Sequence, residues 1–570
     1  MSTPDNTTPA GQRYDVAILG AGIAGSMLAA VLARNRVRTL LIDASTHPRF
    51  AVGESTIPYT SALVRLISAR YDVPEVAALS TYKDIRDNIS RNCGWKKNFG
   101  FVYHRAGRPQ NPAEANQLVL PVALQTETHL FRQDTDQYMF NVALKYGADA
   151  RTGVKISGVD IDGGSGVVLH AESGEEFHAE YIVDASGFRS PLADRLSLRE
   201  QPTRARTHSR SLFTHMVGVK PYDETQSGRM HGQPSRWHDG TLHHVFDGGW
   251  LWVIPFDNTK DSLNPLCSVG LTLDPRVHPA GDATAQEEFD AFLERFPDIA
   301  KQFKNAKVAR PWVKTGRLQY SSKQVIGDRF CLTAHAAGFI DPLYSRGLTN
   351  SFEVVNALAS RLIESSRDRD WSMERFQYME DLQQGLFDVH DDLVYTSFVA
   401  FRDYDLWNAV FRTWALSTVL AALALENAYF AFASHGRDEV FKNLEQTRWP
   451  GSPFPISESY NEMRLEALKL CREVDEQGLD PKVAANRLFS VLQSADYIPP
   501  AFKIGVPEQH WVYLTPPKMI QAAKWAAGPA APKEVGALMH GALGGLVKER
   551  VRNLLPHSRR IPDDLGRGRP

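Results

Sequence analysis

The hydrophobic pattern near the start of the chain is that of two short buried strands separated by a helix. An apolar run at 14–19 (Tyr-Asp-Val-Ala-Ile-Leu) ends in a glycine-rich turn, and a longer segment of small and apolar residues follows at 26–34. A second apolar run at 39–42 ends at an aspartate. Short apolar runs bounded by turn residues are typical of buried strands. We therefore expect strand, turn, helix and strand in this order.

The turn after the first strand carries glycines in the spacing G-x-G-x-x-G. These are Gly20, Gly22 and Gly25, with Ala24 between the last two, and Asp43 follows the second strand. In such a unit the first glycine permits the tight turn, the second lets the backbone approach a pyrophosphate, and the third lets the helix pack closely on the sheet. An acidic residue about 20 positions further on holds a ribose hydroxyl. The segment therefore predicts a dinucleotide-binding unit.

The rest of the chain divides into regions of different pattern. Strand-like runs and turns alternate to about residue 200, β-rich segments fill about 205–315, and a strand at 329–333 leads into a helix near 348. Beyond about 370 the pattern is helical. We expect an α/β (α+β) fold with these parts: a doubly wound Rossmann-like domain at about 13–200 and 315–370, an interposed, mainly antiparallel β-sheet at about 205–315, a helical C-terminal domain at 371–555, and flexible tails at 1–12 and 556–570.

Composition and charge fit a soluble globular protein and argue against several other classes. Of the 570 residues, 43% are hydrophobic and 23% are charged, and the net charge of −2 gives no basic footprint for nucleic acid. The most apolar segment, 413–425, is shorter than the roughly 20 residues of a membrane-spanning helix, so we expect a core helix there. The polar segment 1–12 does not have the apolar core of a signal peptide.

Cysteine and histidine positions favour neither disulfides nor a metal site. The four cysteines lie far apart, without a C-x-x-C pair (Cys93, Cys267, Cys331 and Cys471). The histidines show no spacing typical of metal ligands. We expect no metal cofactor and a reducing, cytoplasmic location.

Several motifs make the chain similar to one enzyme family. Gly-Glu-Ser at 53–55, Gly-Trp-Leu-Trp-Val-Ile-Pro at 249–255 and Gly-Phe-Ile-Asp-Pro at 338–342 together resemble the flavin-dependent halogenases, which add a W-x-W-x-I-P segment to the scaffold of aromatic hydroxylases. Segments 93–96, 129–134 and 341–347 further resemble the members of that family that act on phloroglucinol-type phenols. The resemblance covers about residues 14–430, so 13–370 would be the FAD-binding halogenase module.

This resemblance implies a reaction, its cofactors and its partners. The enzyme would use FAD as FADH2, O2 and chloride or bromide to form hypohalous acid, and would halogenate a free phenol, resorcinol or phloroglucinol in secondary metabolism. Because the chain has no second G-x-G-x-x-G motif, a separate NAD(P)H-dependent flavin reductase would supply the reduced flavin. No nucleic-acid or membrane partner is implied. The alternative is an FAD-dependent aromatic monooxygenase, a hydroxylase that would need neither the lysine nor the tryptophan pair described below.

Two consecutive lysines compete for the role of catalytic lysine. The Cys-Gly pair at 93–94 and the spacing to Phe101 both align Lys96 with the lysine that relays hypohalous acid to the substrate. In a strand, Lys96 and Lys97 point to opposite faces, so only one of them faces inward. We therefore take Lys96 as catalytic and Lys97 as a surface charge. The resemblance also makes Glu54 catalytic, near the flavin and Lys96.

The resemblance assigns the remaining site residues to three groups. Trp250, Trp252 and Tyr344 would line the passage between flavin and substrate, although alternate tryptophans in a strand also suit plain core packing. The backbone N–H groups of Arg346 and Gly347, at a helix N-terminus, would bind the halide. The flavin would contact Gly20, Gly22, Ala24, Gly25, Asp43, Glu54, Arg132, Asp184, His335, Asp341 and Leu348. For Glu54 and Arg132 an ordinary salt bridge remains an alternative.

Two positions depart from related families. Tryptophan halogenases carry a glutamate where this chain has Tyr344, which argues against tryptophan as substrate. Flavin hydroxylases have Gly-Asp where this chain has Ala334 and His335, and that aspartate binds the flavin. We expect FAD to be bound less tightly here.

Overall fold

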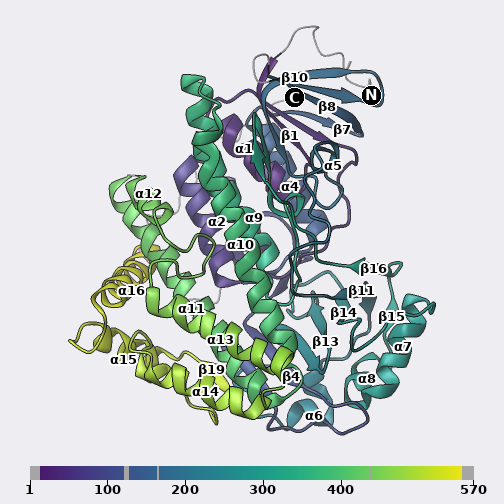
Figure 1. Ribbon diagram of the computed structural model, residues 1–570, viewed down its shortest axis with the longest axis vertical. Helices are drawn as coiled ribbons and strands as arrows, with labels where there is room; N and C mark the ends of the chain where they lie inside the picture. The colour runs from purple at the N-terminus through teal and green to yellow at the C-terminus, as the bar shows by residue number, and fades with distance from the viewer. Residues whose placement is uncertain (1–12, 121–126, 163–165, 437, 555–570) are drawn as a thin grey trace.

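The computed structural model describes residues 13–120, 127–162, 166–436 and 438–554. The tails that we expect to be flexible, 1–12 and 556–570, lie outside the described residues. Figure 1 shows two β-sheets along the long axis of the molecule, the first near the chain's N-terminal strands and the second at the opposite end. Helices α9 (Arg346–Asp368) and α10 (Met373–Ala400) run beside the sheets, and the remaining C-terminal helices gather on one side of the second sheet.

The first sheet contains the predicted dinucleotide-binding unit. Its strand order is β17-β18-β10-β1-β2-β7. Strands β18, β10, β1, β2 and β7 run parallel to one another, while β17 and β9 pair antiparallel with β18 and β10. Helix α1 (Ile23–Arg34) connects the first two strands and packs against α4 (Arg132–Lys145) and α9. The strands are β1 (Arg13–Leu19), β2 (Thr39–Asp43), β7 (Asp149–Thr152), β8 (Ile156–Asp162), β9 (Gly166–Ala171), β10 (Glu176–Asp184), β17 (Ile326–Gly327) and β18 (Phe330–Leu332). The predicted strand, turn, helix and strand are confirmed.

The second sheet is mainly antiparallel and draws its strands from three parts of the chain. Its order is β15-β11-β14-β13-β12-β4-β5-β19, with β16 also paired to β11. Besides the strands within about 205–315, it includes β4 and β5, which precede that range, and β19, which follows it. The strands are β4 (Asn98–Tyr103), β5 (Ala115–Val119), β11 (Arg210–Val217), β12 (Thr241–Phe246), β13 (Gly249–Pro255), β14 (Leu266–Leu273), β15 (Lys307–Val308), β16 (Val313–Arg317) and β19 (Trp511–Tyr513). A separate two-stranded ribbon joins β3 (Gly94–Trp95) to β6 (Thr128–His129).

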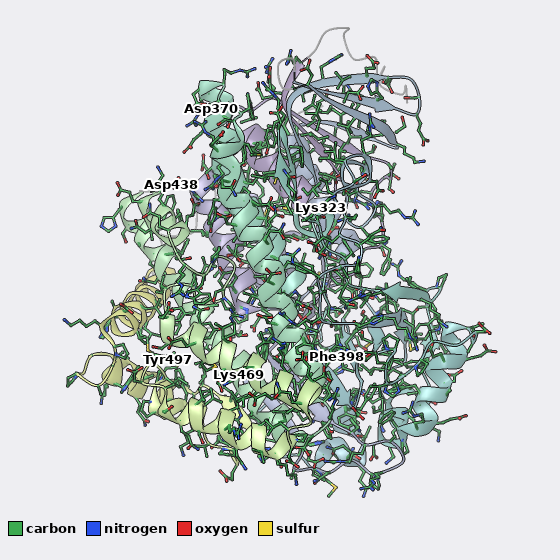
Figure 2. The ribbon with its side chains drawn as sticks, viewed as in Figure 1. Lys323, Asp370, Phe398, Asp438, Lys469 and Tyr497 are labelled. Atoms are coloured by element: carbon green, nitrogen blue, oxygen red, sulfur yellow. The ribbon has the colours of Figure 1, made fainter. Side chains whose placement is uncertain are left out.

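Long helices connect the two ends of the molecule. In Figure 2, Asp370 lies just before α10 at one end, and Phe398 lies near the other end of α10, beside the second sheet. Helix α2 (Pro58–Tyr71) packs between α9 and α11 (Tyr404–His435). The other helices are α3 (Tyr82–Asn88), α5 (Pro191–Arg195), α6 (Gln226–Arg229), α7 (Ala285–Arg295), α8 (Pro297–Phe303), α12 (Glu439–Glu445), α13 (Glu458–Gln477), α14 (Pro481–Ser494), α15 (Pro516–Ala526) and α16 (Lys533–Leu554).

Helix α11 is the core helix expected around 413–425. Among the described residues it is the one helix long and apolar enough to cross a membrane, but 61% of its apolar window is buried inside the protein. An aromatic series runs along the end of α10 and the start of α11, and all its members belong to one hydrophobic cluster: Phe398, Phe401, Tyr404, Trp407, Phe411 and Trp414. These side chains are therefore packing residues in this structure.

Candidate active site

The glycine-rich turn between β1 and α1 forms one wall of an open cleft of about 570 Å³. Gly20 has a φ of +99°, and a Cβ there would lie 2.5 Å from the carbonyl oxygen of Ala185. A Cβ on Gly25 would lie 2.0 Å from the carbonyl oxygen of Gly20, so only glycine permits the close approach of the helix to the turn. A Cβ on Gly22 would meet only the Arg49 side chain, at 4.0 Å, so this position faces the cleft. The cradle fits a dinucleotide.

Asp43 lies at the carboxyl end of β2, on the edge of this cleft. Its Oδ2 accepts a hydrogen bond of 2.7 Å from the backbone N–H of Ala21 and pairs with Arg49 at 2.7 Å. Its Oδ1 accepts from the N–H of Ser45. The carboxylate is thus fixed beside the glycine turn, where an acidic residue that binds a ribose is expected.

Arg132, at the start of α4, ties the loop after β2 to the helix. Its Nε and Nη2 donate to both carboxylate oxygens of Asp136, at 2.7 and 2.8 Å. Its Nη1 donates to the carbonyl oxygens of Val52 and Gly53. Because Arg132 also lines the cleft, it combines the salt bridge considered above with a position beside the cofactor space.

The cleft continues into an inner cavity of about 140 Å³ beneath the second sheet. Val52, Arg132, His335 and Leu348 line both spaces. Trp250, Trp252, Glu54, Ser55 and Thr241 line the inner cavity, and so do Gly347 and His243. The cavity therefore runs from the start of α9 to the tryptophan pair.

Trp252 is held in place within this wall. Its Nε1 donates to Ser268 Oγ at 3.1 Å, and its ring covers Gly270 on the neighbouring strand. A Cβ on Gly270 would lie 2.0 Å from the ring. Trp250 is 1% exposed and lies 5.5 Å from Trp252, centroid to centroid.

The cavity wall next to the open cleft is formed by two turns with unusual backbone geometry. In the short helix η5 (Ala334–Ala336), Ala334 has a φ of +49°, a conformation that favours glycine. Burial lowers the pKa of His335 to about 4, so this ring is neutral. Ser345, with a φ of +54°, precedes α9, whose first residues are Arg346 and Gly347. The first N–H groups of a helix have no partner within it, and they carry the positive end of its dipole.

Two predicted flavin ligands lie behind the cleft instead of lining it. Asp184 accepts hydrogen bonds from Ser186, from Ser190 Oγ and from the N–H of Leu192, which closes the turn after β10. Asp341 accepts from Ser209 Oγ at 2.8 Å and from the N–H of Leu343. Burial raises the pKa of Asp341 to about 7, and these hydrogen bonds oppose the rise. Both carboxylates stabilise turns that shape the site.

Lys96 is fully buried between β3 and β4. Its Nζ donates to Ser55 Oγ at 2.9 Å and to the carbonyl oxygen of Thr56 at 2.6 Å, and it lies 3.9 Å from the centroid of the Phe99 ring. Burial lowers the pKa of Lys96 to about 7, while the charge of Glu127 acts in the opposite direction. Lys96 lies behind the cavity wall that Ser55 and Thr241 form.

Lys97 has the opposite environment. Its Nζ pairs with Asp239 at 2.9 Å and lies over the Trp95 ring, and its side chain is 31% exposed. The two lysines therefore point to different sides. We expected this of a strand, but both residues lie in the two-residue link between β3 and β4.

Glu54 contacts a histidine that the sequence did not single out. Its Oε1 lies 2.6 Å from His215 Nε2, and both side chains are about 98% buried. In this extended segment Ser55 points to Lys96 and Glu54 points away from it. Within the described part of the chain, no hydrogen bond or ion pair joins Glu54 to Lys96.

Tyr344 is fully buried and packs away from the inner cavity. Its hydroxyl lies 2.6 Å from Ser397 Oγ, and its ring stacks on Trp414 with the centroids 5.0 Å apart. The structure thus places Tyr344 in the packing between the second sheet and the C-terminal helices.

Comparison with known proteins identifies the family. The sequence profile of the tryptophan halogenase family matches residues 15–70 and 99–447. The chain is a flavin-dependent halogenase of this family. The family and the fold class expected from the sequence motifs are thus confirmed.

Individual relatives match the halogenase over most of its length. It is 45% identical to tetracycline 7-halogenase of Kitasatospora aureofaciens over 534 residues, which cover 93% of this chain and 96% of the relative. It is 44% identical to the monodechloroaminopyrrolnitrin halogenase PrnC of Pseudomonas fluorescens over 494 residues, covering 86% and 87% of the two chains. The crystal structure of halogenase PltM in complex with phloroglucinol and FAD superposes with a TM-score of 0.85 at 34% identity, covering 88% and 99%.

These relatives establish the cofactors of the halogenase. It uses FAD, and it requires halide and O2 as the family does. The glycine cradle, Asp43 and Arg132 fit the dinucleotide. The described residues contain no group of three or more His, Cys, Asp or Glu side chains arranged for a metal ion. All four cysteines of the halogenase are buried and unpaired.

Proposed function

We propose that this enzyme halogenates an electron-rich phenol with hypohalous acid that Lys96 relays from the flavin to the substrate. The observation that carries this proposal is the environment of Lys96, a fully buried lysine whose pKa is lowered to about 7. Near neutral pH a large fraction of such side chains is an uncharged amine, which can take up an electrophilic halogen. A solvated lysine would be almost entirely protonated.

The hypohalous acid forms on one side of the tryptophan wall. Bound FADH2 supplies the reducing equivalents with which O2 and halide give this reagent. Trp250 and Trp252 line the inner cavity beside the flavin cleft, and in this proposal they separate the flavin from the aromatic substrate. Halide would bind at the backbone N–H groups of Arg346 and Gly347, because the 23-residue helix α9 begins there with its positive dipole end at the cavity.

Glu54 belongs to the catalytic group in this proposal, with its carboxylate held by His215 at the cavity wall. Residues 13–370 form the FAD-binding module, with the second sheet interposed at about 205–315 and completed by strands from outside that range, and 371–555 form the helical domain. The enzyme works in the cytoplasm. A separate NAD(P)H-dependent reductase delivers the reduced flavin.

Free phenols are the substrate class that the comparisons favour. The PltM structure contains phloroglucinol, and the name of the 45% identical relative specifies tetracycline. A phenol has a pKa near 10, and its ionised form activates its own ring, so it needs no glutamate at the position of Tyr344. The runner-up is an arylpyrrole, which the name of PrnC favours.

A product assay by mass spectrometry tests this function. The assay contains FAD, a flavin reductase with NADH, O2, chloride or bromide, and a panel of phloroglucinol, resorcinol, a polycyclic phenol, an arylpyrrole and tryptophan. A halogen isotope pattern on a phenol supports the proposal. A product with added oxygen and no halogen would show that the enzyme is a monooxygenase. Halogenation of the arylpyrrole alone would show that the substrate is not a phenol.

A further inference from the structure

A chain of buried hydrogen bonds ends at Lys96. Lys96 Nζ lies 2.9 Å from Ser55 Oγ, which in turn lies 2.9 Å from Thr241 Oγ1. Thr241 Oγ1 lies 2.9 Å from Nε2 of His129, and His129 Nδ1 lies 2.8 Å from the carbonyl oxygen of Pro255. All four side chains are more than nine-tenths buried. They come from distant parts of the sequence, since 186 positions separate Ser55 from Thr241.

The donor and the acceptor of each hydrogen bond follow from the end of this series at the carbonyl oxygen of Pro255. A carbonyl oxygen only accepts hydrogen bonds, so Nδ1 of His129 carries the proton that points to Pro255. Burial lowers the pKa of His129 to about 3, and the charge of Lys96 acts in the same direction. The ring is therefore neutral, and its Nε2 is an acceptor.

The two hydroxyl groups transmit this direction to Lys96. A hydroxyl has one hydrogen, and Thr241 donates it to His129, so the oxygen of Thr241 accepts from Ser55. The hydrogen of Ser55 is thereby used, and its oxygen accepts from Nζ of Lys96. A second N–H of Lys96 donates to the carbonyl oxygen of Thr56 at 2.6 Å.

We propose that Ser55, Thr241 and His129 are positioning residues that aim the amine of Lys96. Two N–H groups are committed, so the uncharged amine keeps its lone pair in the one remaining direction, where the halogen would bind. If Ser55 lost its acceptor, its hydroxyl would be free to donate to Lys96, and the amine would rotate so that its lone pair points at Ser55 and no longer at the reagent. This role deepens the proposed function and rests on it.

The other charged and titratable groups around Lys96 are few. Glu127 acts on Lys96 from the segment before β6, and Lys96 acts on His129 of β6 and on His243 of β12. Burial lowers the pKa of His243 well below its usual range, so this ring is neutral. Asp341, whose pKa is also about 7, is held by Ser209 and Leu343 and, among the described residues, makes no hydrogen bond to these side chains. A change in pH dependence near pH 7 that appears when this hydrogen-bond chain is broken is therefore assigned to Lys96.

Thr241→Val tests the positioning role, because valine keeps the shape of threonine and removes the hydroxyl. We expect kcat to fall about tenfold, while Thr241→Ser, which restores the hydroxyl, stays within about twofold of the wild type. The acid limb of the pH–kcat profile should move to lower pH in Thr241→Val, because a hydrogen bond donated to the uncharged amine disfavours its protonation. The melting temperature and FAD affinity are measured alongside.

Thr214→Val is the matched control. Thr214 Oγ1, in the same sheet, donates to the carbonyl oxygen of Arg310 at 2.6 Å, so this variant removes a buried hydroxyl that neither lines the inner cavity nor reaches Lys96. It should keep the wild-type kcat and pH profile. Ser55→Ala breaks the chain at a second point, and the double variant Ser55→Ala/Thr241→Val should lose no more activity than the more affected single variant.

The outcomes separate this inference from the proposed function. If Lys96→Met abolishes halogenation while Thr241→Val keeps the wild-type kcat and pH profile, the positioning role is overturned and the proposed function stands. Strictly additive losses in the double variant would also overturn it. Full halogenation by Lys96→Met would overturn the proposed function itself.

Discussion

The indole ring of Trp252 lies directly over Gly270, with no space between them for a side chain. A Cβ on Gly270 would lie 2.0 Å from the ring, on a strand that is hydrogen-bonded to the strand of Trp252. The tryptophan can occupy the wall of the inner cavity only because glycine stands opposite. The wall that the proposed function places between flavin and Lys96 therefore depends on a glycine that does not itself line the cavity.

Gly270→Ala should push the Trp252 indole out of this position. We expect a stability loss of about 1–3 kcal/mol, as for other overpacked sites, and a smaller share of FADH2 oxidation that ends in halogenated product. Thermal unfolding and the ratio of product to NADH consumed measure the two effects. Gly316→Ala on β16 is the control, since a Cβ there meets nothing within 4 Å and should change neither quantity. An unchanged ratio of product to NADH consumed in Gly270→Ala would contradict a partition role for Trp252.

Gly22→Val should weaken FAD binding without unfolding the protein. A side chain at Gly22 would meet only Arg49 and would extend into the cleft, where the resemblance places the pyrophosphate. We expect an affinity for FAD about tenfold weaker, because one or two backbone contacts to the cofactor would be lost. The melting temperature should stay close to that of the wild type. Flavin fluorescence titration measures the affinity. Gly25→Ala is the contrasting variant, since its Cβ would clash with backbone and should lower the melting temperature itself.

Ala334→Gly should stabilise the enzyme. Ala334 has a φ of +49°, and a non-glycine residue in this region destabilises the folded state by about 1–2 kcal/mol. Glycine avoids this strain, but part of the gain is lost because glycine also raises the conformational entropy of the unfolded chain. We expect a net gain of about 1 kcal/mol or less, seen as a small rise in melting temperature in the FAD-free protein. A fall in melting temperature would show that the methyl group contributes packing that outweighs the backbone strain.

The buried amine of Lys96 should make stability depend on pH in a defined window. Its pKa of about 7 in the folded enzyme is below its usual value of 10.5, so between these values the unfolded chain binds more protons. The contribution of Lys96 to stability therefore rises as pH increases from 7 to 10.5. Lys96→Met removes the free-energy cost of burying this amine, so the variant should melt at a higher temperature than the wild type. The difference in melting temperature should shrink as pH rises from 7 to 10.5. A difference that does not vary with pH would contradict the lowered pKa.

Local sequence patterns were sufficient for the parts of the site that lie within a few residues of each other. The three glycines and Asp43 follow one strand–helix–strand unit. Alternation along an assumed strand also predicted opposite directions for Lys96 and Lys97, although both lie in the link between β3 and β4. The W-x-W segment likewise predicts its position in a strand. Each of these features depends on residues that lie close together in the sequence.

Contacts between distant segments were not predictable from the sequence. His215 reaches Glu54 across 161 positions, and Thr241 reaches Ser55 across 186. Such pairs depend on how β11 and β12 lie against the loop after β2, and one sequence carries no periodic signal for them. His129 lay within a motif that resembles the family, but its role in the chain of hydrogen bonds needed the structure.

The comparison of Lys96→Met with Lys97→Met in the halogenation assay tests the central claim most directly. Both variants replace a lysine with an unbranched apolar side chain at neighbouring positions, and FADH2 oxidation is followed in the same reactions. We predict that Lys96→Met oxidises FADH2 but forms no halogenated phenol. Lys97→Met, which loses a partly exposed pair with Asp239 and the contact of the ammonium with the Trp95 ring, should form product at a rate near that of the wild type. Halogenated phenol from Lys96→Met at the wild-type rate would contradict the account.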